Sequence, residues 1–405
     1  MIRTNKFLGS ILLISGTSIG AGMLGIPVMS CFSGFFPSFI LLALIWFFMF
    51  LTALLFLEVN IATPGEPNLV SMASKTLGFW GKAISWTAYL LLLYCLVSAY
   101  IAASSPLFLT VLDSIFNMHF PSWIGPFPLL AIFGVFVYIG TRAVDYINRI
   151  LMFGLVIAYI LLVIFVPSHI HFDLLSHVDV KPMLLAVPMI IVSYGFHIII
   201  PTLTTYMNHD KKKLRWALFI GSLIPFFIYL LWEFLVLGAV PLLGDNGLVK
   251  SFTMGELSTA PLMRIIKNPL IYYASSLFAF FAVVTSFIGV SLSLSDFLTD
   301  GLKLGKKSGG KEIVTLLTFI PPLIFVYAYP RGFYLALQYA AVFVAILLCI
   351  LPALMTWALP KPCVYRSFWG RVFLIFIIVV SLGIITLDIL EEAHILKQLM
   401  SHYLN

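Results

Sequence analysis

Eleven long apolar runs divide this chain, and each is long enough to cross a lipid bilayer as a helix. About 20 apolar residues of α-helix span the hydrocarbon core. Only 10% of the 405 residues are charged, roughly half the share found in soluble domains. The sequence therefore predicts an all-α polytopic membrane protein, a single transmembrane domain over 1–405. Its spans are expected near 7–29, 34–58, 83–105, 125–141, 146–167, 183–205, 214–240, 270–297, 312–329, 332–357 and 368–390.

The charged residues predict an orientation. Most of the 23 Lys and Arg residues fall in the connections on the side of the N-terminus. Because basic residues concentrate in cytoplasmic connections, the N-terminus is expected in the cytoplasm and, after eleven spans, the C-terminus outside. The net charge of +7 is then an orientation signal, and no nucleic-acid partner is expected. The four cysteines are dispersed and predict neither a disulfide framework nor a metal site.

The first span contains a glycine-rich segment, Ser15–Pro27, with four glycines and three hydroxyl side chains. Backbone groups cannot remain unpaired in lipid, and glycine is a poor helix former. Such a segment is expected to interrupt the helix where the backbone meets a polar cavity. The alternative is close helix packing through Gly16-x-x-x-Gly20.

The sixth span carries a weaker echo, Ser193-Tyr194-Gly195-Phe196-His197, before Pro201. Two interrupted helices at matching positions of oppositely oriented halves indicate an inverted-repeat transporter with a midplane site. The expected repeats are 7–167 and 183–357, with 368–390 as an accessory eleventh helix. An ordinary kink at Gly195 is the alternative for the sixth span.

These motifs, together with Ser286-Phe287-Ile288-Gly289-Val290-Ser291-Leu292, resemble those of the hydroxy and aromatic amino acid permease family, in particular its bacterial tyrosine/tryptophan-specific branch. The resemblance covers nearly the whole chain. It implies two inverted five-helix repeats, as in the wider amino acid permease superfamily, with broken helices one and six. It also implies uptake of tyrosine and/or tryptophan across the bacterial inner membrane by cation symport and alternating access, with the proton favoured over sodium.

An amino acid brings a carboxylate and an ammonium, and helix breaks can bind both. The N–H groups of Gly20, Ala21 and Gly22 are expected to face the carboxylate. Carbonyl groups near Ser15 and Gly16, and in span six, are expected to accept from the ammonium. Aromatic side chains are expected to surround the ring. The predicted substrate-binding residues are Ser15, Gly16, Thr17, Gly20, Ala21, Gly22, Ser193, Tyr194, Phe196, His197, Tyr94 and Phe287.

Few residues are candidates for ion coupling. His197 is the one histidine deep within a predicted span, where it acts as substrate partner, as proton carrier or as a packing hydrogen bond. Glu233 is a carboxylate within span seven. Ser286 and Ser291 could contribute to a hydroxyl and carbonyl sodium cage, although such serines usually bond back to their own turn. No cofactor and no metal centre are expected.

Other functional classes explain the sequence less well. A channel requires a continuous polar lining, and an enzyme requires paired ligands or a nucleophile with its base. The expected partners are therefore an aromatic amino acid, a coupling cation (H⁺ or Na⁺) and the bilayer. An amino acid or polyamine exchanger, or less readily a channel, remains the alternative, and no enzymatic activity is expected.

Overall fold

The computed structural model describes residues 5–65, 67–303, 309–329, 332–359, 364–392 and 402–403. Within these ranges the secondary structure is entirely helical. Ten helical segments are long and apolar enough to cross a membrane, and the bent pair Lys6–Ser18 and Ala21–Ser30 supplies an eleventh candidate. The predicted all-α polytopic class is thus confirmed, with each candidate span overlapping a predicted apolar run. The division into two inverted repeats stays a prediction.

The spans contain the following elements in chain order: α1 (Lys6–Ser18), η1 (Ala21–Leu24) and α2 (Ile26–Ser30); α3 (Phe35–Ala62); α4 (Leu69–Phe116); η2 (Ser122–Ile124) and α5 (Pro126–Ile139); α6 (Thr141–Phe165); η4 (Lys181–Ala186), α8 (Val187–Ser193), η5 (Phe196–Ile199) and α9 (Ile200–Tyr206); α10 (Lys211–Ala239); α13 (Pro269–Leu302); α14 (Gly310–Ala328); α15 (Gly332–Val344), η6 (Ala345–Ile350) and α16 (Leu351–Ala358); and α17 (Phe368–Glu392). The connections contain η3 (Val166–His169), α7 (Phe172–Leu175), α11 (Leu248–Met254), α12 (Thr259–Ile265) and η7 (Val364–Arg366).

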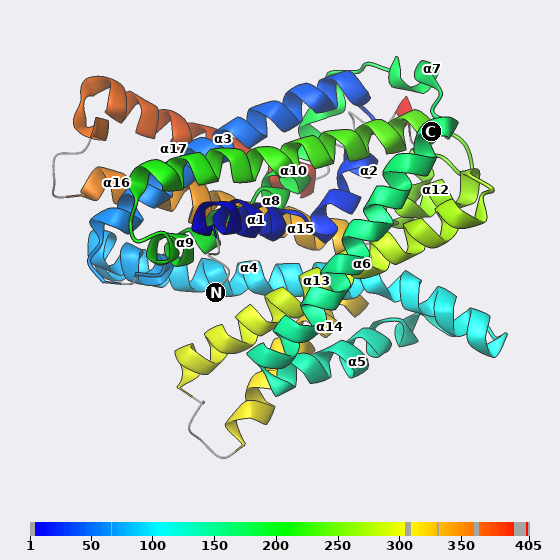
Figure 1. Cartoon of the computed structure of the whole chain (residues 1–405), viewed down its shortest axis with the longest axis horizontal. Coiled ribbons are helices and arrows are strands. Elements are labelled where there is room, and N and C mark those ends of the chain that lie inside the picture. Colours follow the sequence, from blue (N-terminus) through cyan, green and yellow to red (C-terminus); the bar gives the residue numbers. More distant parts are fainter. Residues whose placement is uncertain are drawn as a thin grey trace.

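The two interrupted spans lie inside the bundle. Helix α1 packs against α10, and α8 packs against α15, while α13 packs against both α4 and α6. Figure 1 shows the long helix α4 running beneath α1, with α6 and α13 crossing it and α5 and α14 on its other side. The breaks in both spans therefore lie next to other membrane-spanning helices of the bundle.

Span one breaks sharply and span six breaks gently. Helix α1 ends at Ser18, Ile19 and Gly20 are extended, and the pair of segments is bent by 47°. Helix α8 ends at Ser193, and Tyr194 and Gly195 leave helical geometry without a turn into the extended region. A proline follows each break within the first two positions of the next α-helix, where its missing N–H is tolerated: Pro27 in α2 and Pro201 in α9.

Helix α4 begins well before the third predicted span, 83–105. Helix α4 begins at Leu69, where the Asn68 side chain accepts from the N–H of Ser71 and caps it. Gly78 interrupts this helix with a φ of 69°, a left-handed value that glycine adopts without steric cost. A short helical segment therefore precedes the membrane span proper.

Candidate functional site

A cavity of about 460 Å³ lies where the two interrupted spans meet their neighbours. Its lining comes from both sides of the break in span one, from the end of α8, and from α4, α6, α13 and the tenth span. Most of the lining is apolar. The polar groups come chiefly from interrupted backbone and from hydroxyl side chains.

Backbone N–H groups at the start of η1 form one side of the site. A helix leaves its first N–H groups without partners inside the helix. Here the N–H of Ala21 donates to Ser286 Oγ at 3.0 Å, and the N–H of Met23 donates to the Gly20 carbonyl at 3.3 Å. The N–H groups of Gly20 and Gly22 have no acceptor among the residues that the structure describes. Both glycines line the cavity, which leaves two donors available to an anion.

Backbone carbonyl groups at the end of α1 supply partial negative charge on the other side of the site. In a continuous helix the Gly16 carbonyl would accept from Gly20, and the Thr17 carbonyl from Ala21. The N–H of Ala21 is bound to Ser286 instead, and Gly20 lies in extended backbone beyond the helix. Gly16 and Thr17 both line the cavity, so carbonyl oxygens without helical partners are available there to an ammonium group.

Tyr229 of α10 joins the two breaks. Its hydroxyl oxygen lies 2.6 Å from the carbonyl oxygen of Ser18, where α1 ends, and 2.9 Å from that of Ser193, where α8 ends. The side chain is fully buried, and its ring packs against that of Tyr194. Because a hydroxyl carries one proton, Tyr229 donates to one of the two carbonyl groups at a time. Sequence reasoning missed this residue, since a tyrosine within an apolar span carries no distinguishing pattern.

The apolar wall of the cavity comes largely from one face of α4. Tyr89 and Tyr100 lie on this face at opposite ends of three helical turns, with leucines between them. Tyr94, which was predicted to line the pocket, lies on another face, and its hydroxyl donates to the Leu317 carbonyl of α14 at 2.9 Å. The lining residues of α4 are Tyr89, Leu92, Leu93, Leu96 and Tyr100.

Helix α6 contributes a polar group that sequence reasoning also missed. Asn148 supplies the one side-chain amide among the described residues that line the cavity, and Met152 lies one turn further along the same helix. An amide can both donate to and accept from a ligand hydroxyl or indole N–H. Asn148 and Met152 are spaced so that they lie on one face of α6. No sequence pattern indicates that this face borders a cavity.

The structure brings part of the predicted site together and places the rest elsewhere. Ser286 contacts the break through the Ala21 N–H, and Ala21 itself is buried behind the lining. The predicted residues that line the cavity are Gly16, Thr17, Gly20, Gly22, Ser193 and Ser286.

Three predicted substrate residues have other contacts and do not line the cavity. Ser15 Oγ lies within hydrogen-bonding distance of the carbonyl groups of Ile11 and Gly221, at 2.9 and 2.8 Å. Phe287 is buried and stacks with a phenylalanine of α14. Tyr194 is buried, and its hydroxyl has no partner among the described residues.

His197 is fully buried outside the cavity lining. Its Nε2 lies 2.9 Å from Thr52 Oγ1, and its ring stacks on Phe196. Thr52 Oγ1 also lies 3.0 Å from the Met49 carbonyl, and Nδ1 of His197 has no partner among the described residues. These contacts match the packing role that sequence reasoning left open for His197, and they place Phe196 in the same buried cluster.

Glu233 of α10 is fully buried against the second half of span one. Its Oε1 accepts a hydrogen bond from Ser30 Oγ at 2.7 Å, whereas Oε2 has no partner among the described residues. Ser291, the other predicted coupling residue on α13 besides Ser286, is buried, and no described residue is a partner for its hydroxyl. Neither Glu233 nor Ser291 lines the cavity.

The hydroxyl side chains of α13 bond mainly to their own helix. Thr285 Oγ1 lies 2.7 Å from the Phe281 carbonyl, and Ser293 Oγ lies 3.0 Å from the Gly289 carbonyl. Their protons are thereby engaged within the turn. Among the described residues, no group of three or more His, Cys, Asp or Glu side chains could hold a metal ion.

Comparisons with known proteins give a consistent result. The model of the tryptophan/tyrosine permease family matches residues 3–388. The chain is 33% identical over 387 residues to tyrosine-specific transport system 1 of Haemophilus influenzae, covering 93% of this chain and 95% of that protein. It is 29% identical to the tryptophan-specific transport protein of the same species, with 87% of each chain covered. It is also 30% identical to glutamine transporter 2 of Aliivibrio fischeri, with 88% and 90% covered.

Proposed function

Because this chain belongs to the tryptophan/tyrosine permease family, we propose that it imports tyrosine, tryptophan or both across the bacterial cytoplasmic membrane. Membership makes it a permease and not an enzyme. The proposed orientation has the N-terminus in the cytoplasm, as the distribution of Lys and Arg predicts.

The observation that carries this proposal is the pairing of free donors and free acceptors across one break. The N–H groups of Gly20 and Gly22 bind the substrate carboxylate, and the carbonyl groups of Gly16 and Thr17 bind its ammonium. No lysine, arginine, aspartate or glutamate is among the described residues that line the cavity. A zwitterionic ligand suits such a site, because each of its charges meets backbone dipoles of opposite sign.

The rest of the cavity suits an aromatic side chain. A volume of about 460 Å³ falls within the usual range for small-molecule sites, about 300–1,000 Å³. Tyr89 and Tyr100 provide ring faces, and Asn148 provides a partner for a phenol hydroxyl or an indole N–H. We assign the side chain of the substrate to this wall.

We further propose proton symport through alternating access, with Glu233 as the proton carrier. Placing a charged carboxylate at membrane depth costs about 2.5–3.5 kcal/mol. The carboxylate is therefore protonated when the site is closed, and it can release its proton when water reaches it. Glu233 meets this condition, since it is buried and one of its oxygens is unpartnered. Glu233 also contacts the second half of span one through its hydrogen bond with Ser30. A change in its protonation therefore acts directly on the segment that follows the break.

Transport by purified protein in liposomes tests the proposal. Labelled tyrosine and tryptophan should accumulate under an imposed pH gradient, acid outside, and unlabelled aromatic amino acids should compete. Tyramine and a des-amino analogue each lack one of the two charges, and both should fail to compete. Strong competition by tyramine would favour an amine or polyamine carrier, and uptake that responds only to internal amino acid would favour an exchanger. Accumulation driven by sodium alone would replace the proton as the coupling ion.

A further inference from the structure

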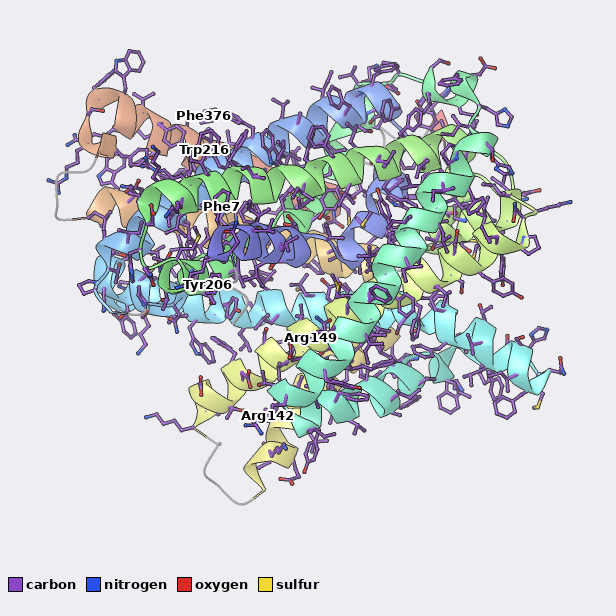
Figure 2. The ribbon with its side chains drawn as sticks, viewed as in Figure 1. Phe7, Arg142, Arg149, Tyr206, Trp216 and Phe376 are labelled. Carbon is purple, nitrogen blue, oxygen red and sulfur yellow. The ribbon has the colours of Figure 1, made fainter. Side chains whose placement is uncertain are left out.

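A second cavity, of about 780 Å³, lies at the end of the bundle where α10 begins. It is a groove between α3 and α10, bordered by Tyr365 of η7, and it shares no lining residue with the substrate cavity. Figure 2 shows Trp216 near the left end of α10, on the side of α3. The lining residues, which we call the basic groove, are Phe50, Leu54, Lys211, Lys212, Arg215, Trp216, Phe219 and Tyr365.

The rim of the basic groove carries more positive charge than its single acid neutralises. Glu58 forms ion pairs with Lys211, at 2.5 Å, and with Arg215, at 2.6 Å. Lys212 forms no ion pair among the residues that the structure describes. Three cations thus face one carboxylate. The guanidinium of Arg215 also has more N–H donors than Glu58 can occupy, which leaves donors for an anionic ligand.

The floor of the basic groove is apolar and partly aromatic. Phe50 and Phe219 meet edge to face, with ring centroids 5.5 Å apart, and Leu54 lies one turn from Phe50 on α3. Trp216 is 54% exposed at the start of α10, next to the basic rim. Tryptophan and tyrosine concentrate at the membrane interface, where one end of the ring is apolar and the other is wet. The groove therefore passes from a cationic rim to a hydrocarbon-like floor.

We propose that the basic groove binds an anionic phospholipid, with the phosphate at Lys212 and Arg215 and an acyl chain along Phe50, Leu54 and Phe219. Basic pockets between membrane helices are suited to anionic headgroups, since charge and hydrocarbon are matched together. The net positive rim disfavours a headgroup that carries its own ammonium. A free inorganic anion would use the rim alone and leave the apolar floor empty.

The neighbouring lysine gives a matched control. Lys213 lies one residue from Lys212, but it pairs with Asp210 at 3.0 Å and does not line the groove. Hydrogen bonds from the backbone N–H and the side chain of Lys213 lower the pKa of Asp210 below its usual value. Lys212→Gln and Lys213→Gln remove the same charge at adjacent positions, and only the first removes it from the groove.

The test measures lipid binding to the full-length protein in a neutral detergent, by native mass spectrometry with phosphatidylglycerol or phosphatidylcholine. In detergent there is no bilayer surface potential, so a lysine contributes only where the lipid touches it. Lys212→Gln should weaken phosphatidylglycerol binding about fivefold, the effect of one cation near an anionic headgroup. Lys213→Gln should leave it unchanged, and the wild-type protein should bind phosphatidylcholine more weakly than phosphatidylglycerol.

A second variant tests the apolar floor. Leu54→Trp fills the groove without changing its charge, and it should also weaken phosphatidylglycerol binding while gel filtration shows an intact protein. Equal effects of Lys212→Gln and Lys213→Gln, equal binding of both lipids, or unchanged binding in Leu54→Trp would each overturn the proposal. Displacement of phosphatidylglycerol by millimolar inorganic phosphate would also overturn it, in favour of a site for the free anion.

Discussion

In span one, the half before the break is exposed along one side, whereas the half after it is buried except at Gly22. Leu12 and Leu13 of α1 are 60% and 45% exposed, and Gly16 and Thr17 are also exposed. All four line the substrate cavity. In the second half, every residue of α2 is buried, and of η1 only Gly22, at the cavity, is partly exposed. The cavity is therefore reached from the side of α1, which is the N-terminal end of the bundle.

Contacts from three directions hold the second half in place. The Leu24 carbonyl accepts from the N–H of Ser258, at 3.0 Å, in the connection before α13. Ser30 bonds to Glu233 of α10. A Cβ at Gly25 would lie 2.7 Å from the Met189 Cε of α8, so these segments are in close contact. The comparison teaches that one short segment both has a free N–H donor at the cavity and packs firmly against the far side of the bundle.

The largest effect is expected from a side chain at the start of the second half. Gly22→Val should lower substrate affinity about 100-fold, because two charged hydrogen bonds at about 1.5 kcal/mol each are lost. A Cβ at Gly22 would lie 2.7 Å from Ser193 Oγ, which would push the break away from span six. Scintillation-proximity binding of labelled tyrosine and tryptophan measures the loss.

Gly16 provides the matched control in the first half. A Cβ there meets nothing within 4 Å. Gly16→Ala should keep affinity within about threefold of the wild type, whereas Gly22→Ala should already weaken it about tenfold. Equal affinities of Gly16→Ala and Gly22→Ala would mean that the two halves of span one contact the ligand equally closely.

Cysteine labelling tests the difference in exposure directly. Thr17→Cys should react with a membrane-impermeant maleimide about 30-fold faster than Ala21→Cys, because the buried position reacts only after a local opening of about 2 kcal/mol. The native cysteines, of which Cys31 and Cys349 are buried, are replaced first. Inside-out vesicles should give the faster reaction, and bound substrate should slow it. Faster labelling of Ala21→Cys would reverse the comparison.

Glu233→Gln tests whether the carboxylate that contacts the second half of span one carries the coupling proton. The amide keeps an acceptor for Ser30 but cannot release a proton. A pH gradient of one unit is worth about 1.4 kcal/mol per proton, so accumulation across it should fall about tenfold. Exchange of labelled for unlabelled substrate should persist, since it needs only the loaded carrier. His197→Gln is the comparison variant, and it should keep gradient-driven accumulation. Loss of accumulation in His197→Gln alone would move the carrier role to His197.

The smallest effect is expected at the hydroxyl that joins the two breaks. Tyr229→Phe leaves the carbonyl groups of Ser18 and Ser193 without this donor, and should destabilise the protein by about 1–2 kcal/mol. Thermal melting in detergent reports the change, together with a severalfold loss of affinity. Tyr159→Phe also removes a hydroxyl, half-buried, which donates to the Ile228 carbonyl at 3.0 Å away from both breaks. Its affinity should equal that of the wild type, and a similar loss in both variants would assign Tyr229 a general packing role.

The sequence predicted the fold class and the break in span one for reasons that are local. A run of about 20 apolar residues identifies a span by itself, and the glycines of Ser15–Pro27 cannot form a stable helix in lipid. The backbone residues of the candidate site follow from that break, which explains why Gly16, Gly20 and Gly22 were found from the sequence.

The side chains of the candidate site could not be predicted in the same way, because the face of a helix that borders a cavity depends on its neighbours. Tyr94 and Tyr100 have the same residue type on the same helix, but six residues place them on different faces. His197 lies within the sixth span, as predicted, whereas its partner, Thr52, lies in a different span. Asn148 and Tyr229 carry no signal of their own, and only the packing of α6 and α10 against the breaks brings them to the site.

The proposed binding of both ligand charges by peptide groups has a consequence for how such a protein can evolve. Peptide N–H and carbonyl groups persist through every substitution, and they do not titrate, so recognition of the amino acid zwitterion is inherited with the helix break. The wall that meets the variable side chain comes from α4 and α6, where Tyr89, Tyr100 and Asn148 can be exchanged by single mutations. Substrate preference can then change from one amino acid side chain to another, while binding of the carboxylate and ammonium that all amino acids share is retained.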